Sequence, residues 1–116
     1  MSPASIIRSA VTRASLGELA KECFGDMVKA VVDIERGIMA IGGELHADEE
    51  HMLLEDGSSQ EHLWGINIYP ERKGDGWIEY DSMINMRPRQ GNRSRSVEDP
   101  LLRKKILAVV LSLVSK

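Results

Sequence analysis

Four short segments of the chain are apolar or alternate between apolar and polar residues, and each predicts a β-strand. The first two cover residues 27–33 and 37–41, and Gly37 lies at the tight turn between them. Val31 is expected on one side of the first strand, and three residues on the other: Val28, Ala30 and Val32. Because both sides are apolar, this hairpin is expected at the centre of a sheet.

A second hairpin is predicted from residues 63–69, which alternate with a period of two, and residues 77–86, which return after a turn at 70–76. Pairing Ile68 with Ile78 keeps the two core faces together. The same register sets two outward pairs: Asn67 with Glu79, and Tyr69 with Trp77. Two aromatic residues on a solvated face indicate either a helix cover or a subunit contact, and Tyr69 and Trp77 are therefore interface candidates.

Helical spacing predicts three helices. The first is capped by Thr12 or Ser15 and ends at Gly25. The second is capped by Asp48 and ends at Gly57, and the third starts at Asp99 with a proline at its first position.

The resulting order is helix, hairpin, helix, hairpin, helix. It predicts one α+β domain over residues 1–116, with a mainly antiparallel four-stranded sheet and helices packed mostly on one face. The alternative is a small barrel-like sheet wrapped on the last helix. That helix carries two apolar stripes, one of them Leu107, Leu111 and Val114, so a two-fold homodimer is expected.

Composition narrows the classes of function that this chain can have. The chain has 116 residues, 42% hydrophobic and 28% charged, with a net charge of −3, which excludes wholesale disorder and disfavours general nucleic-acid binding. Cys23 is the single cysteine, so an intramolecular disulfide is excluded and a reducing cytoplasm is expected. The longest apolar run is too short for a membrane span, and no membrane partner is expected.

Charge is segregated along the chain. Residues 44–61 hold seven acidic residues and no Lys or Arg, whereas residues 87–105 hold seven basic residues against two acidic ones. The two segments can pair with each other, stay solvated, or face a partner. The acidic face is assigned to Glu44, Asp48 and Glu50.

The basic segment begins with a loop rich in hydrogen-bond donors. Arginine forks suit phosphate or carboxylate oxygens, and amide and hydroxyl groups accompany them. The loop has none of the spacing of a nucleotide-binding loop. It is therefore a candidate site for an anionic small molecule or an acidic protein partner, through Arg87, Arg89, Gln90, Asn92, Arg93, Ser94 and Arg95. Arg87, at a strand end, is expected to pair internally with Glu44 or Asp48, and Arg89 and Arg95 to face outward.

His46 is the candidate catalytic residue. Asp48 can orient it as a general base, but the sequence pattern shows no nucleophile or oxyanion hole. The histidines and acids around it lack a recognised ligand spacing, so no metal and no other cofactor is expected.

Several strings together resemble a family of small bacterial proteins that carry a domain of unknown function: residues 24–27 (FGDM), 42–48 (GGELHAD), 54–58 (LEDGS), 63–67 (LWGIN) and 87–94 (RPRQGNRS). The resemblance covers almost the whole chain and implies no activity, substrate or cofactor. It departs from the family at Ala10 and in the extra arginines Arg89 and Arg95.

The sequence therefore favours a non-enzymatic binding or interaction protein whose functional face joins the arginine loop to the acidic segment. The alternative is an enzyme that acts on a phosphorylated or carboxylated small molecule, with His46 as base and Arg87 and Arg93 as anion clamps.

Overall fold

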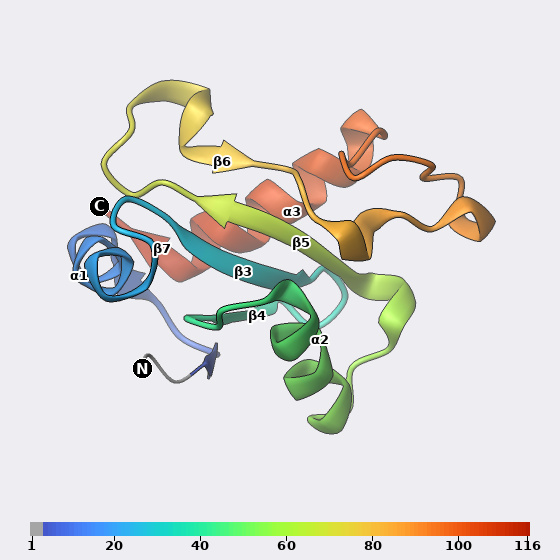
Figure 1. The fold of residues 1–116 in the computed structure, drawn as a ribbon, viewed down its shortest axis with the longest axis horizontal. Helices are drawn as coiled ribbons and strands as arrows, with labels where there is room; N and C mark the ends of the chain where they lie inside the picture. The colour runs from blue at the N-terminus through green and yellow to red at the C-terminus, as the bar shows by residue number, and fades with distance from the viewer. Residues whose placement is uncertain (1–3) are drawn as a thin grey trace.

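A computed structural model describes residues 4–116, and its centre is a five-stranded antiparallel sheet with the order β1-β4-β3-β5-β6. The strands are β1 (Ser5–Ile7), β3 (Val28–Asp33), β4 (Ile38–Ile41), β5 (Leu63–Ile68) and β6 (Ile78–Glu79). The helices are α1 (Arg13–Cys23), α2 (His46–Glu55) and α3 (Pro100–Leu113). The fold is mixed α and β, as the sequence predicts (Figure 1).

Four 3₁₀ turns and one further strand pair complete the chain. The turns are η1 (Gln60–His62), η2 (Gly74–Trp77), η3 (Met83–Asn85) and η4 (Pro88–Gln90). Strands β2 (Val11–Thr12) and β7 (Val114–Ser115) pair in parallel. This pairing ties the start of α1 to the end of α3.

Both predicted hairpins are present, and the register predicted for the second one is confirmed. Val32 pairs with Met39 between β3 and β4, and Gly37 closes the turn with a φ of +71° that favours glycine. Ile68 pairs with Ile78 and Asn67 with Glu79 between β5 and β6. Since side chains alternate along a strand, these registers decide which residues lie on each side of the sheet.

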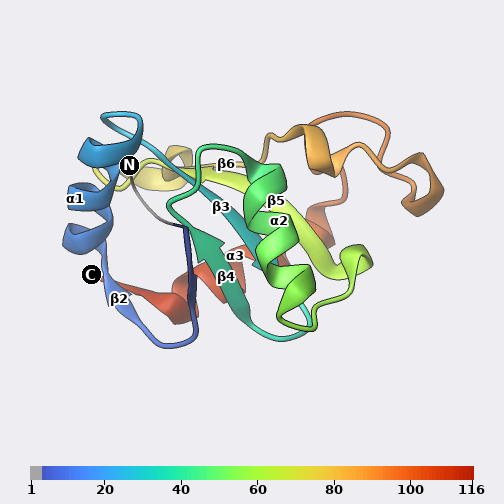
Figure 2. The ribbon, with the colours of Figure 1, turned by 60° about the horizontal axis from the view of Figure 1, so that its bottom comes forward.

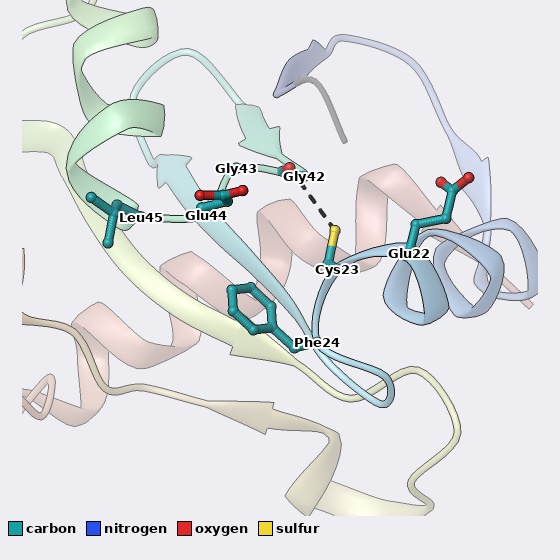
Figure 3. Close-up of a pocket in the computed structure, with 7 residues that line it drawn as sticks. All are labelled: Glu22, Cys23, Phe24, Gly42, Gly43, Glu44 and Leu45. Atoms are coloured by element: carbon teal, nitrogen blue, oxygen red, sulfur yellow. Dashed lines mark hydrogen bonds between the residues drawn. The ribbon is translucent and has the colours of Figure 1, made fainter. Parts of the chain in front are cut away.

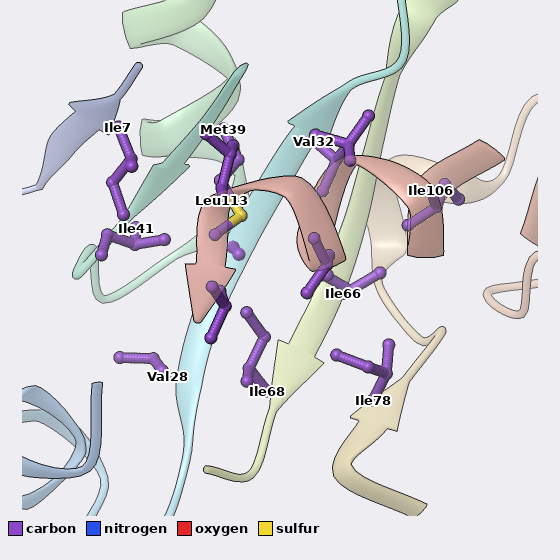
Figure 4. Packing of buried hydrophobic residues seen from close by; sticks show 14 of the residues in the cluster. Ile7, Val28, Val32, Met39, Ile41, Ile66, Ile68, Ile78, Ile106 and Leu113 are labelled. Carbon is purple, nitrogen blue, oxygen red and sulfur yellow. The ribbon is translucent and has the colours of Figure 1, made fainter. Parts of the chain in front are cut away.

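Helices α2 and α3 lie on opposite faces of the sheet (Figure 2), and α1 adds Leu16 to the core on the α3 face, so two of the three helices share one face. The α3 face holds the main core, with Val28, Ile66 and Ile106 among its members (Figure 4). The α2 face holds a smaller cluster around Val31 and Leu53. Apolar residues on both sides of β3 require a cover on each side.

The sheet has one more strand than the four predicted. The additional strand is β1, in which Ile6 and Ile7 pair with Ala40 and Met39. The sheet is open, with β1 and β6 at its edges, so the barrel-like alternative is wrong.

Two of the three predicted helix starts are confirmed. Thr12 Oγ1 accepts a hydrogen bond from the Ser15 amide at 3.0 Å, and Asp99 Oδ1 accepts one from the Leu101 amide at 2.9 Å. Helix α2 instead begins at His46, with Leu45 at the N-cap and Asp48 inside the first turn. An acidic residue in the first turn complements the helix dipole without capping the helix.

Trp77 lies in the main core rather than on an exposed face, with 8% of its surface exposed. The guanidinium of Arg13 covers its ring, 4.1 Å from the centroid, and Arg13 Nε donates to the Pro70 carbonyl. Tyr69 is half-buried under Arg72. The expected outward pair of aromatic rings is therefore covered by two arginines of the same chain.

The predicted long strand at residues 77–86 is wrong, since β6 has two residues. Beyond it, side chains complete the outer edge of β5. Asn85 Oδ1 accepts from the Gly65 amide at 2.8 Å, and Asn85 Nδ2 donates to the Gly65 carbonyl at 3.0 Å. Arg87 Nη2 donates to the Leu63 carbonyl. These contacts replace the backbone of a longer β6.

Replacing Asn85 tests this arrangement. Asn85→Ala leaves two buried backbone groups of Gly65 without partners, so we expect a loss of about 2–4 kcal/mol in the free energy of unfolding. Gln90→Ala, which removes an exposed amide from the same segment, should cost less than about 1 kcal/mol. Urea denaturation measures both. Equal losses in the two variants would contradict the role given to Asn85.

Candidate functional site

The segment from Asn85 to Glu98 is held in shape by one buried side chain, Asn92. Its Nδ2 donates to the carbonyls of Asn85, Ser94 and Ser96 at 2.7, 3.0 and 2.9 Å. Its Oδ1 accepts from the Glu98 amide at 2.9 Å. Asn92, which the sequence predicts as a binding residue, has a full set of internal partners.

Arg87 is directed into the protein, as expected, but its partners are backbone carbonyls rather than Glu44 or Asp48. Its guanidinium donates to the carbonyls of Ile84, Gln60 and Leu63 and stacks 4.2 Å from the Trp64 ring centroid. A half-buried guanidinium needs several acceptors, and neighbouring backbone carbonyls supply more of them than a single carboxylate does. Burial lowers the pKa of Arg87, and the charge of Glu50 opposes that shift.

Of the other loop candidates, some are exposed without a described role and others bond to neighbouring segments. Gln90 donates to the Glu61 carbonyl, and Arg89, Arg93 and Ser94 are exposed. Arg95, also exposed, forms two hydrogen bonds to the carboxylate of Asp81, at 3.0 and 3.3 Å. Of these residues, Arg95 is the one that lines a depression.

The acidic candidates do not form one face. Glu44 and Asp48 are exposed, whereas Glu50 is half-buried on the side of α2 toward Arg87. Residues two apart on a helix point in different directions, which separates Asp48 from Glu50.

A small depression of about 170 Å³ lies where the end of the arginine loop meets the start of α2, and we call it the lysine–histidine pocket. Its polar lining residues are Lys29, His46, Ser82 and Arg95. Leu45, Ala47, Met83 and Ile84 complete it. The segment after β6 supplies one wall, and β3 and the start of α2 supply the others.

His46 is buried in this pocket, with 9% of its surface exposed. Its Nε2 lies 2.8 Å from the Ile66 carbonyl, which only accepts, so Nε2 carries the proton and Nδ1 is left as an acceptor. Burial lowers the pKa of His46, and the nearby charges of Lys29 and Arg95 lower it further, whereas the hydrogen bond with the Ile66 carbonyl and the charge of Asp81 oppose the shift. The ring is therefore neutral at pH 7.

Lys29 supplies the second cation of the pocket. It is half-buried on β3, and its Nζ lies 5.3 Å from the centroid of the Phe24 ring. No carboxylate among the described residues lies within salt-bridge distance of it. Lys29 and Arg95 thus line the same pocket, and among the described residues the only ion pair that either forms is the one between Arg95 and Asp81.

A larger hollow of about 480 Å³ adjoins this pocket and shares Leu45 with it. We call it the cysteine hollow, and Figure 3 shows its lining residues: Glu22, Cys23, Phe24, Gly42, Gly43, Glu44 and Leu45. The Cys23 thiol points at the Gly42 carbonyl, 3.9 Å away, while the Glu22 carboxylate points away from it. Phe24 and Leu45 are exposed and give the hollow an apolar rim.

Glu49 is a buried acid behind the wall of this hollow. Its Oε2 accepts from the Gly43 amide at 2.8 Å, and its Oε1 has no hydrogen-bond partner among the described residues. Burial raises the pKa of Glu49 to about 9, so the side chain is protonated at neutral pH. A Cβ on residue 43 would lie 2.9 Å from Glu49 Cγ, which explains the glycine there.

A third depression, between η2 and α3, also contains arginines, but they are already engaged. Arg103 donates to the Val97 carbonyl and to Ser96 Oγ, and Arg72 lies over the Tyr69 ring. This leaves the lysine–histidine pocket as the better candidate site.

Within residues 4–116, no three His, Cys, Asp or Glu side chains gather closely enough to hold a metal ion. In the same range, no helix combines the length and the apolar character needed to cross a membrane.

The sequence pattern does not identify Lys29 and Ser82 as site residues. One signal is present for Lys29, which is a charged residue inside a mostly apolar strand. It lies directly opposite Asn67 in the register of β3 and β5. Ser82 gave no such signal, because its position depends on where β6 ends.

The chain belongs to the family DUF5674, described as a protein of unknown function, whose model matches residues 5–113. The expected resemblance to a family of unknown function is thereby confirmed for almost the whole chain. Comparisons with curated proteins and with solved structures found no match.

Glu49→Gln should stabilise the protein in alkaline solution. The folded-state pKa of about 9 lies above the ordinary 4.5, so ionisation favours the unfolded chain and stability falls as pH rises between these values. The amide keeps the shape and the bond from Gly43 without this penalty. We expect a gain of about 1–3 kcal/mol at pH 8 and little change at pH 4.

Denaturation curves at several pH values measure this difference, and Glu44→Gln is the matched control because Glu44 is exposed. An unchanged pH dependence in Glu49→Gln would show that the buried acid does not control stability.

Proposed function

We propose that this protein is a non-enzymatic binding protein that takes a small anion in the lysine–histidine pocket. The observation that carries the proposal is that Lys29 and Arg95 converge on one depression. Lys29 has no carboxylate partner among the described residues, and Arg95 forms an exposed ion pair with Asp81. Both side chains donate and neither accepts, which suits phosphate or carboxylate oxygens.

The surroundings support an anion of small size. The pocket measures about 170 Å³, below the range of typical drug-sized sites. Helix α2 starts at its wall with no side-chain cap, so the first backbone amides add a favourable dipole. An anion here would bridge Lys29 and Arg95, and would compete with Asp81 for the Arg95 guanidinium.

An enzyme that uses the same pocket is the second candidate. Its support is His46, a neutral imidazole fixed by the Ile66 carbonyl with Nδ1 free to accept a proton. The clamps for such an enzyme would be Lys29 and Arg95, since Arg87 is occupied by carbonyls and Arg93 does not line the pocket.

The proposal also includes an acidic protein partner and a cytoplasmic location. Arg89 and Arg93 are exposed on the same loop and can extend the surface toward an acidic protein partner. Cys23 is a free thiol, which fits a cytoplasmic protein.

Anion binding is tested by titrating the wild-type protein with inorganic phosphate and following amide shifts by NMR. We expect saturable shifts at the pocket residues, and Lys29→Met or Arg95→Met should weaken binding by about tenfold. Arg89→Met is the matched control, because Arg89 is exposed and outside the pocket, and should bind as the wild type does.

The results separate the candidates. Shifts confined to Arg89 and Arg93 would reject the pocket in favour of the loop surface. Conversion of a bound phosphate ester, seen by ³¹P NMR and lost in His46→Ala, would favour the enzyme. No saturable binding of phosphate or acetate would contradict the proposal.

We also propose a homodimer, formed through the stripe of α3 that contains Leu107 and Leu111. Leu111 is 59% exposed and Leu107 is half-buried, so one chain leaves this stripe partly uncovered. Light scattering at tens of micromolar should give about twice the 12.9 kDa of one chain. Leu111→Arg should yield monomers, whereas Leu101→Arg, an equally exposed leucine off that stripe, should not.

A further inference from the structure

Exposed apolar side chains line both the lysine–histidine pocket and the cysteine hollow beside it. Leu45 belongs to both linings, Phe24 to that of the hollow and Met83 to that of the pocket. These side chains are 55%, 43% and 63% exposed, in that order. Single exposed apolar residues are ordinary, but several that line one recess are typical of a surface that binds something.

Lys29 lies where the two spaces meet. It lines the pocket, and its Nζ lies 5.3 Å from the centroid of the Phe24 ring, which lines the hollow. Figure 3 shows this ring directed from the end of α1 toward Leu45. A group bound to Lys29 is therefore next to the apolar rim of the hollow, and a longer ligand can pass along Leu45 into it.

The charges of the two linings differ in sign. Among the described residues, Lys29 and Arg95 line the pocket and no acid does, whereas Glu22 and Glu44 line the hollow and no lysine or arginine does. Because like charges repel, an anionic group is favoured in the pocket and disfavoured in the hollow. What the hollow offers a ligand is its apolar rim and the half-buried Cys23.

The volumes agree with this division. The pocket, of about 170 Å³, has room for a phosphate or carboxylate group and little more. The hollow, of about 480 Å³, is within the range of small-molecule sites and has room for an apolar chain or ring.

We infer that the ligand is a small amphipathic anion, and this inference rests on the proposed function. Its phosphate or carboxylate group contacts Lys29 and Arg95 in the pocket. Its apolar chain or ring passes Leu45 and covers Phe24 in the cysteine hollow. Binding then removes exposed apolar surface of the protein and of the ligand from water, which favours the complex.

Matched ligand pairs test the apolar part. Hexanoate and acetate share the carboxylate, and hexyl phosphate and methyl phosphate share the phosphate. A fully buried methylene group tightens binding by about fourfold, and a chain in an open hollow is partly buried. Calorimetric titration of the wild-type protein should therefore show about tenfold tighter binding of the longer member. The pair that binds more tightly identifies the charged group.

A charged chain end separates the apolar rim of the hollow from its acids. 6-Aminohexanoate carries an ammonium group at the end of the chain and should lose most of the gain of hexanoate, because that group must stay in water. Tighter binding of 6-aminohexanoate than of hexanoate would overturn the inference, since it would show that Glu22 or Glu44, and not the apolar rim, holds the chain end.

Leu45→Ala and Phe24→Ala should each lower the preference for hexanoate over acetate by about threefold and keep the affinity for acetate within about threefold. Both side chains are exposed, so the variants should fold. Leu101→Ala is the matched control, because Leu101 is 66% exposed and outside both depressions, and it should keep the preference. Full preference in both Leu45→Ala and Phe24→Ala would overturn the inference.

The wild-type protein gives a readout that does not depend on folding of a variant. Phe24 is the single phenylalanine of the chain, so its ring protons are a specific NMR probe of the hollow. The terminal methyl group of bound hexanoate should give nuclear Overhauser contacts to this ring. Saturation without such contacts, or equal affinities for hexanoate and acetate, would overturn the inference but leave the anion site intact. Failure of inorganic phosphate and acetate to bind would instead reject the proposed function itself.

Discussion

The outer edge of β5 is completed by side chains, and the position of the candidate site depends on this edge. Asn85 bonds both backbone groups of Gly65, and Arg87 bonds the carbonyl of Leu63. These contacts hold the segment after β6 against the sheet. Ser82 then lies directly over Gly65, where a Cβ would be 2.6 Å from Ser82 Cβ. The wall of the lysine–histidine pocket follows from that approach.

The opposite wall depends on the start of α2. Glu49 accepts a hydrogen bond from Gly43 and packs against its Cα, which fixes the helix to the end of β4. One turn earlier, His46 bonds the Ile66 carbonyl on β5. Two buried polar groups thus attach α2 to two different strands, while Leu53 supplies its apolar contact. Polar anchoring of this kind fixes a unique position more strictly than apolar packing alone.

Local patterns predicted the two hairpins well, since a period of two and a tight turn determine both face and register. The Ile68–Ile78 pair and the Asp99 cap are such cases. The prediction failed where the outcome depends on contacts distant in sequence. Strand β1 forms because Ile6 and Ile7 meet β4 more than thirty residues later. Strand β6 ends early because Asn85, not a strand backbone, satisfies Gly65.

Prediction of the candidate site was limited in the same way, by contacts between residues distant in sequence. The arginine-dense segment 87–95 contributes one residue, Arg95, to the lining of the pocket. The sequence pattern could not show that the donors of Arg87 and Asn92 bond to backbone carbonyls, because the positions of those carbonyls depend on the tertiary fold.

Polar groups in this domain therefore fall into two classes. Asn85, Asn92 and Arg87 have internal partners that hold the chain in place. Lys29 and His46 Nδ1 line the lysine–histidine pocket and have no hydrogen-bond partner among the described residues. The anion site that we propose therefore rests on a lysine of β3 and an imidazole at the start of α2 more than on the arginine-rich loop, of which Arg95 alone lines the pocket.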